Sequence, residues 1–134
     1  MDNCVVCPYC NMEADKVTGE FMYPHRPDLY HLSFYHCSYN HEPAYVGCHK
    51  DGKPYGTLAD AKTRLARNRA HKMFDRLWKH KLITRNQAYS LLSKHMKLKP
   101  ELTHIGMFNV EQAGIAEQFG HTEYMRRKHV KHNN

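Results

Sequence analysis

The sequence has no long hydrophobic run and no apolar segment at its start. No stretch approaches the roughly 18 apolar residues of a membrane-spanning helix. The opening MDNCVVCPYC is too short and too polar for a secretion signal. Internal repeats and low-complexity tracts are also missing, and with 25% charged and 41% hydrophobic residues the composition is that of a globular protein. We therefore expect a cytoplasmic, folded protein without a membrane partner.

Acidic residues are scarce relative to basic ones. Thirteen Asp and Glu face 20 Lys and Arg, which gives a formal net charge of +7 and a pI near 9.2. Such a surface favours polyanions, namely nucleic acid, an acidic protein or an anionic membrane. The mean hydropathy of -0.78 leaves little apolar surplus for a core, so a structural metal would help a chain of this size to fold.

Cysteine is present in an odd number and only near the start. All five cysteines lie within the first 48 residues, and in a reducing compartment such a cluster favours metal binding over disulfides. Cys7 and Cys10 form a Cys-x-x-Cys motif that lets two thiolates converge on one Zn²⁺ from a tight turn. Asn11 follows, where a left-handed residue is often needed. We interpret this motif as half of a structural zinc site.

The other half of the site must come from later residues. Cys37 is the expected third ligand, because the 27 residues after Cys10 can hold a ribbon hairpin. We favour His41 as the fourth ligand, since Cys-x3-His forms a second close-spaced pair. Cys48 remains the alternative, which would give an all-thiolate site. Cys4 also precedes Cys7 by three residues, but it lacks the Pro and the following turn residue, so we do not expect it to bind.

The spacing of hydrophobic residues predicts an α+β fold. Alternating segments at 20–23, 33–37 and 44–47 predict short strands, and the Gly- and Pro-containing segment 50–56 predicts a turn or linker. We therefore expect a zinc-ribbon module over residues 1–55, packed with a basic bundle of three to four helices over residues 56–134.

Helix signals begin after residue 56. Thr57 predicts the cap of a helix that runs to about residue 80, with a buried stripe at Ala59, Ala66, Ala70, Met73 and Leu77. The single Trp78 is expected in the core. Thr84 and Gln87 predict a capping box for a helix over 85–95. Pro100 predicts a short turn. A last helix is expected from Asn109 to Gly120, followed by a frayed basic tail.

Several segments resemble an uncharacterised family of small phage and bacterial proteins described as zinc-finger-containing. The matching stretches are 7–10, 23–30, 44–49, 56–59, 70–71, 74–75, 77–78 and 104–108. The resemblance implies a topoisomerase-type zinc ribbon and an origin in the cytoplasm of a bacterium or a phage-infected host. It implies no activity. That ribbon pattern carries a YPxC element after the third ligand, and here the segment Ser38-Tyr39-Asn40-His41 stands in its place. His41 enters as the substitute ligand for this reason.

The favoured function is binding to DNA or RNA, single strands included, with little sequence preference. Ribbon aromatics that could stack on unpaired bases are Tyr9, Tyr35, Tyr39 and Tyr45. Basic residues expected to contact phosphates are Arg64, Arg67, Arg69, Lys72, Arg126, Arg127 and Lys128.

Two alternatives remain open. The chain could be a protein-interaction module that modulates a host polymerase or nuclease, with an acidic host protein as its partner. It could instead be a small nuclease or hydrolase, because a potential base, an anion clamp and a carboxylate follow one another in the chain. The residues of that possible functional cluster are His25, Arg26, Asp28, His49, His71 and Asp75. A turn held by an Arg–carboxylate pair is the simpler interpretation of the first three.

Overall fold

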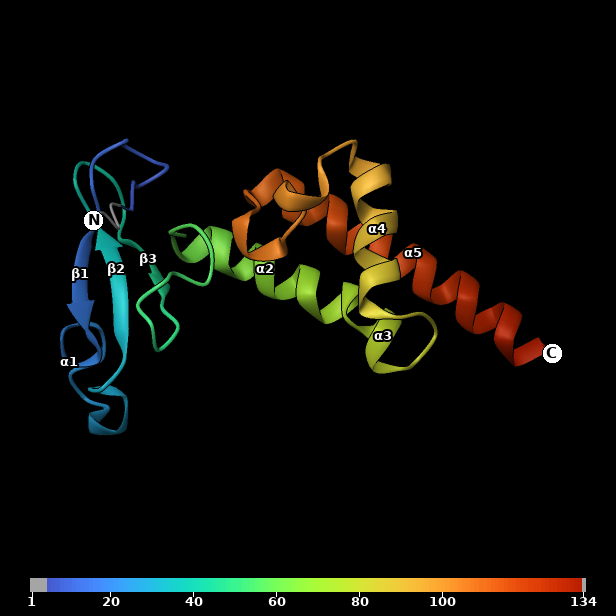
Figure 1. Cartoon of the computed structure of the whole chain (residues 1–134), viewed down its shortest axis with the longest axis horizontal. Coiled ribbons are helices and arrows are strands. Elements are labelled where there is room, and N and C mark those ends of the chain that lie inside the picture. The colour runs from blue at the N-terminus through green and yellow to red at the C-terminus, as the bar shows by residue number, and fades with distance from the viewer. Residues whose placement is uncertain (1–4, 134) are drawn as a thin grey trace. The chain divides into compact units, whose positions relative to one another are not determined.

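Three strands form one antiparallel sheet in the order β1-β2-β3. Strand β1 spans Asp15–Thr18, β2 spans Ser33–Cys37 and β3 spans Ala44–Gly47. The computed structural model that shows them describes residues 5–133, with side chains as far as residue 129. Figure 1 shows the three strands side by side. Together with the helices that follow, the sheet confirms the predicted α+β class.

The registers of the sheet place Cys37 at the end of β2. Phe34 pairs with Gly47 and Cys37 with Ala44, while Thr18 pairs with Ser33. Strands β2 and β3 confirm the predicted segments 33–37 and 44–47. Strand β1 was not predicted, because its sequence Asp-Lys-Val-Thr contains one apolar residue and no recognisable alternation.

The predicted strand at 20–23 is wrong. Helix α1 occupies Gly19–Met22 instead, and the Thr18 Oγ1 accepts a hydrogen bond from the Phe21 amide at 3.4 Å. A Cβ atom on Gly19 would lie 1.6 Å from the Leu29 carbonyl oxygen, so only glycine fits this close approach. The alternating pattern that suggested a strand comes from a single helical turn whose Phe21 side chain is exposed.

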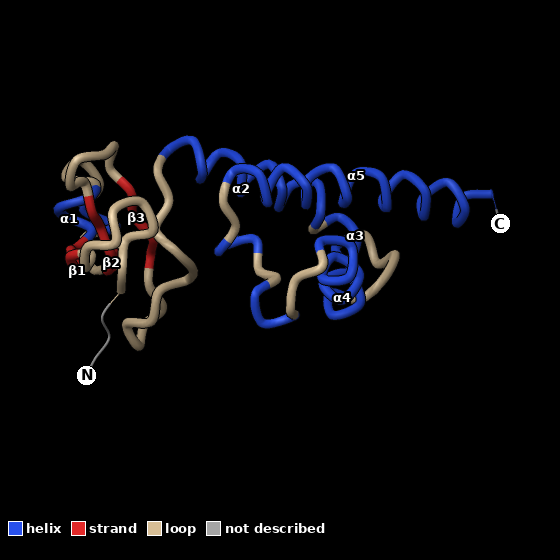
Figure 2. The backbone as a smooth tube through the Cα atoms, turned by 90° about the horizontal axis from the view of Figure 1, so that it is seen from above, coloured by secondary structure: helices blue, strands red, loops and turns tan. Residues whose placement is uncertain are grey.

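The chain divides into two compact units, Met1–Ala61 and Lys62–Asn134. The first unit holds the sheet. The second holds nearly all of α2 (Ala61–Phe74) together with α3 (Arg76–Lys79), α4 (Arg85–Met96) and α5 (Val110–Asn133). Each unit has its own hydrophobic core. Figure 2 shows the helices of the second unit in blue, with the C-terminal part of α5 continuing past α4.

Helix α2 starts three residues later than the Thr57 cap predicts. The Ala59 amide and carbonyl both hydrogen-bond to Tyr45 at 3.0 Å, which holds this segment in an extended bridge to β3. Of the predicted stripe, Ala59, Ala70 and Leu77 are buried, but Ala59 belongs to the sheet unit. A further difference is a break at Asp75, after which α3 begins.

The two later helix starts are confirmed. Thr84 and Gln87 form the predicted capping box of α4, and a short 3-10 turn begins at Pro100. Asn109 and Gln112 form the same reciprocal pair of hydrogen bonds before α5. The predicted end at Gly120 is wrong, since α5 continues to Asn133. Gly120 lies against the Phe74 backbone, where an added Cβ would meet the Phe74 Cα at 2.6 Å.

Trp78, expected in the core, is half-buried and packs against the core of the helical unit. Its ring contacts Phe74 from α2 and Tyr89 from α4, with centroid distances of 5.5 and 5.8 Å. No helix within residues 5–133 has the length and hydropathy of a membrane span.

Candidate metal centre

The first half of the centre is a tight hairpin between Val5 and Ala14. The Ala14 amide donates to the Val5 carbonyl at 2.7 Å, and inside this bridge the Cys7 amide donates to the Met12 carbonyl at 2.8 Å. Asn11 has a positive φ of 62°, which lets the chain reverse directly after Cys10. The left-handed turn predicted at Asn11 is thus confirmed.

The second half lies at the end of β2. Cys37 is the last residue of the strand, and the chain then turns through Ser38–Asn40 before β3 begins at Ala44. Asn40 has a φ of 58° and takes the same left-handed conformation as Asn11. Asn40 follows Cys37 by three positions, whereas Asn11 directly follows Cys10. The turn returns His41 toward Cys37.

Four side chains converge between these two turns. The ligand atoms of Cys7, Cys10, Cys37 and His41 all lie within 4.8 Å of one another. The Cys10 and Cys37 sulfurs are 3.6 Å apart, and the His41 Nε2 lies 3.4 Å from the Cys7 Sγ and 3.6 Å from the Cys37 Sγ. This is a group of four soft donors around one point.

The orientation of His41 is set by its other ring nitrogen. The Nδ1 atom lies 2.6 Å from the Glu42 backbone carbonyl. A carbonyl oxygen only accepts hydrogen bonds, so the proton resides on Nδ1 and the Nε2 lone pair points toward the sulfurs. This is the arrangement that fixes metal-binding histidines. The same hydrogen bond to Glu42 raises the pKa of His41.

The two thiols of the first hairpin differ in their acidity. Burial raises the pKa of Cys7, although the Tyr9 and Cys10 amides act in the opposite direction. Burial would also raise the pKa of Cys10, but the Met12 amide and the neighbouring thiols together lower it. Backbone amides therefore point at both sulfurs and would stabilise their thiolate forms.

The donor set fits a tetrahedral zinc ion. With Zn–S and Zn–N bonds of about 2.3 and 2.0–2.1 Å, ideal tetrahedral ligands lie about 3.5–3.8 Å apart. The closest approaches in the group, 3.4 to 3.6 Å, match that spacing. Three thiolates and one imidazole would fill all four positions. Such a closed site favours a structural role over catalysis.

Cys48, the alternative fourth ligand, is not part of this group of donors. It is buried in the core of the same unit, and burial raises the pKa of its thiol. Its neighbours belong to a hairpin in which the His49 amide donates to the Lys53 carbonyl at 2.8 Å. Cys4, the other additional cysteine, lies outside the described residues.

The residues of the possible functional cluster are divided between the two units. Arg26 donates both Nε and Nη2 to the Asp28 carboxylate, at 3.0 and 2.8 Å, and His25 is exposed beside them. This hydrogen bonding lowers the pKa of Asp28, which makes its carboxylate a poorer general base. The geometry matches a turn held by an ion pair.

The remaining three members have local partners. The His49 ring lies on the Tyr55 ring, with centroids 4.2 Å apart. In the helical unit, His71 Nδ1 lies 3.2 Å from the Asp75 Oδ2, one helical turn away.

All seven basic residues predicted to contact phosphates lie in the helical unit. Arg69, Lys72, Arg126 and Lys128 are exposed, whereas Arg67 is half-buried and donates its Nε to the Phe108 carbonyl at 2.7 Å. Arg126 and Arg127 both bind Glu123, at 2.7 and 3.1 Å. The remaining member, Arg64, is half-buried.

The four aromatics predicted to stack on bases differ in exposure. Tyr9 and Tyr39 are exposed, and both sit on the turns that carry the metal-site donors. The prediction is wrong for Tyr35, which is only 5% exposed and belongs to the core. Tyr45 is half-buried, and its hydroxyl lies 2.6 Å from the Tyr23 hydroxyl.

Residues 3–121 match the model of a family described as a zinc-finger-containing domain. The match covers most of the chain, so the protein belongs to that family. No curated protein and no solved structure is significantly similar to it. The family description and the four converging donors together support zinc binding.

Two features, one in the metal site and one in the helical unit, have no signal in the sequence. The Glu42 carbonyl that orients His41 is a backbone group, which any residue type would supply. In the helical unit, Arg85 lies over the Trp78 and Tyr89 rings. The three residues are spaced at 78, 85 and 89, and only the turn between α3 and α4 brings them together.

Proposed function

We propose that the protein is a zinc-stabilised nucleic-acid-binding protein. In this proposal Cys7, Cys10, Cys37 and His41 hold one structural Zn²⁺, and the helical unit binds the nucleic acid. Binding is to the phosphate backbone, so it has little sequence preference. A topoisomerase-type ribbon and a bacterial or phage host remain part of the prediction from sequence.

The observation that carries the nucleic-acid proposal is the separation of charge between the units. Residues 62–134 contain sixteen Lys and Arg against five Asp and Glu, a formal net charge of +11. Residues 1–61 contain four against eight, a formal net charge of -4. The overall +7 therefore understates the helical unit, whose charge density favours a polyanion.

Exposed cations on α2 make that charge available. Arg69 and Lys72 are both exposed, and no carboxylate among the described residues pairs with either of them. The pair Arg126 and Arg127 contributes less free charge, since both hold Glu123. We therefore assign Arg69 and Lys72 as the first phosphate contacts to test.

The test compares charge reversal in the two units. Binding of fluorescein-labelled single strands and duplexes is followed by anisotropy between 50 and 300 mM salt. Affinity should fall steeply with salt, and R69E/K72E should weaken binding by about 10-fold or more and flatten the salt slope by about one per lost phosphate contact. The matched variant K50E/K53E makes the same charge change in the metal-holding unit and should have a much smaller effect.

Two results would overturn the proposal. One is the absence of binding to any DNA or RNA at 50 mM salt by zinc-loaded protein. The other is an equal loss of affinity in both double variants, because binding would then follow the net charge of the molecule and no particular surface.

A protein partner is the second candidate, and the metal-holding unit favours it. Phe21 and Tyr55 are 59% and 63% exposed, and exposed aromatics are enriched at protein interfaces. The net charge of -4 of this unit suits a basic partner, so the acidic host protein predicted from the overall charge would have to bind the helical unit. Recovery of a partner from nuclease-treated lysate, lost in F21A/Y55A, tests this candidate.

A further inference from the structure

The helical unit carries an aromatic cluster at its surface. Trp78, the only tryptophan of the chain, is half-buried on α3, and its ring lies 5.8 Å from the Tyr89 ring of α4 at an angle of 38°. Phe74 packs beneath both rings, at 5.5 and 4.9 Å. The core thus supports the two outer rings from one side and leaves part of their surface toward solvent.

An exposed arginine covers these rings. The Arg85 guanidinium carbon lies 4.8 Å from the centre of the Tyr89 ring and 5.7 Å from that of Trp78. No carboxylate among the described residues pairs with it. The guanidinium therefore rests on the rings through cation–π contact, with its hydrogen-bond donors free for an anion.

The position of Arg85 is unfavourable for the helix itself. Arg85 is the first residue of α4, after the Thr84 cap, and the first turn contains no acidic residue. A cation at a helix N-terminus opposes the helix dipole. Helix stability thus gives no reason for an arginine here, whereas its contact with Trp78 and Tyr89 does.

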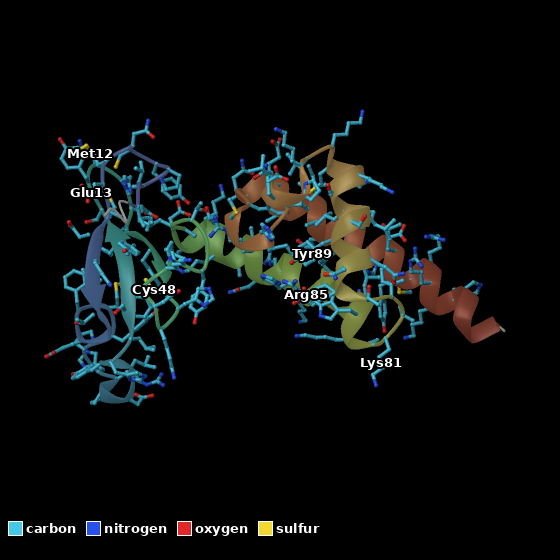
Figure 3. The ribbon with its side chains drawn as sticks, in the orientation of Figure 1. Met12, Glu13, Cys48, Lys81, Arg85 and Tyr89 are labelled. Carbon is cyan, nitrogen blue, oxygen red and sulfur yellow. The ribbon has the colours of Figure 1, made fainter. Side chains whose placement is uncertain are left out.

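Two further cations follow Trp78 closely in the chain. Lys79 is the last residue of α3 and Lys81 lies on the turn that leads to α4, and both are exposed. Figure 3 shows Arg85 and Tyr89 next to each other along α4, with Lys81 on the preceding loop. Burial and the negative charge of Asp75 both raise the pKa of Tyr89. The Asp75 carboxylate is paired with His71, whose Nδ1 lies 3.2 Å from Oδ2. The segment 76–85, which carries Trp78 and Arg85, contains four cations and no carboxylate.

From this arrangement, and resting on the proposed function, we propose that Trp78 and Arg85 form a stacking site for an unpaired base of a single-stranded nucleic acid. The base stacks on the exposed part of the indole, and the Arg85 guanidinium covers it or binds the adjacent phosphate. Lys79 and Lys81 hold the backbone on either side. A base inside a duplex is covered on both faces by its neighbours, so the site selects single strands.

The single tryptophan makes the site directly observable. Zinc-loaded protein is titrated with oligothymidylate, oligouridylate and a DNA duplex at 50 mM salt, and Trp78 emission is recorded beside the anisotropy of the labelled strand. Stacking quenches indole emission. We expect saturable quenching by the single strands, following the same concentration dependence as anisotropy, and little quenching by the duplex. The two single-strand arms show whether DNA or RNA binds more tightly.

A pair of arginine variants separates stacking from charge. R85A and R69A each remove one exposed positive charge from the helical unit. R69A should weaken single strands and duplex alike. R85A should weaken the binding of single strands by a further factor of about 10, the size of one lost stacking contact. Its affinity for the duplex should equal that of R69A. W78F keeps a ring in the core and should weaken single strands by anisotropy, with thermal unfolding measured to verify its fold.

The outcomes distinguish this inference from the proposed function. Binding by anisotropy without any change in Trp78 emission, or R85A behaving as R69A on both ligands, overturns the stacking site and leaves nucleic-acid binding intact. Equal quenching by the duplex overturns the selection of single strands. No binding in any arm overturns the inference together with the function on which it rests.

Discussion

His41 shows how a single backbone contact can define a binding site. An imidazole without a second partner would rotate about its side-chain bonds and offer either nitrogen. Here the Glu42 carbonyl, 2.6 Å from Nδ1, holds the ring so that Nε2 faces the Cys7 and Cys37 sulfurs. The donor geometry is thus prepared before a metal binds, which reduces the ordering cost of binding.

Replacing His41 should therefore weaken zinc binding more than the loss of the hydrogen bond that orients its ring. We expect H41A to lose more than the roughly 10- to 100-fold in affinity that loss of an orienting contact costs, and H41C to retain tight binding, since a thiolate is also a zinc ligand. Zinc content and a chelator competition give the affinities. The control is C48A, which should bind zinc as tightly as the unchanged protein; a large loss there, with none in H41A, would make Cys48 the fourth ligand.

The Cys7–Cys10 half of the candidate metal site is predictable because its signal is local. The five consecutive residues from Cys7 to Asn11 predict a turn, and the φ of 62° at Asn11 agrees with it. The exposure of aromatics was less predictable. Tyr35 and Tyr39 are four residues apart and chemically identical, yet one is 5% and the other 59% exposed. Only the pairing of β2 with both neighbouring strands decides which side chain is covered.

At the scale of elements, the same contrast separates the helix starts from the helix ends. The capping boxes at Thr84 and Asn109 are closed by residues three positions away, so sequence alone predicts them. The errors at Thr57 and Gly120 arise from distant partners. Tyr45 holds Ala59 in a bridge, and Gly120 allows α5 to approach Phe74. Gly120, which the sequence suggests as the end of a helix, is instead the residue at which α5 packs against α2.

The two glycines of α5 should respond oppositely to the same substitution. In G120A the new methyl would meet the Phe74 Cα at 2.6 Å, so we expect a loss of about 2–3 kcal/mol in unfolding free energy. In G114A the new methyl would have no heavy atom within 4 Å apart from its chain neighbours and the adjacent backbone of its own helix, and removal of a flexible residue from a helix interior should stabilise by about 0.5–1 kcal/mol. Urea denaturation measures both. A G120A variant as stable as G114A would mean that α5 does not cross α2 at this residue.

At the scale of the whole molecule, the division into two units is also a division into two hydrophobic cores and two opposite net charges. The cluster around Tyr35, Cys37 and Leu58 lies within the first unit, and the cluster around Phe74, Leu77 and Leu92 lies within the second. The first cluster is small and contains Cys7 and Cys37 themselves, so we expect its stability to depend on the proposed zinc ion. The second consists of apolar side chains and needs none. Charge follows the same division, with -4 in the first unit and +11 in the second.

Removal of the metal should therefore separate the two units in their stability. Excess chelator should unfold the sheet unit, because zinc binding supplies much of its folding free energy. Amides of β2 and β3 should then exchange rapidly with solvent, while amides of α4 and α5 stay protected and the helical circular dichroism changes little. Nucleic-acid affinity should persist, since Arg69 and Lys72 lie on the unit that remains folded. Adding Zn²⁺ back should restore sheet protection, whereas Mg²⁺, which prefers oxygen ligands, should not. If chelation instead abolished helix protection and nucleic-acid binding together, the two units would fold as one cooperative body and the metal would support the binding surface directly.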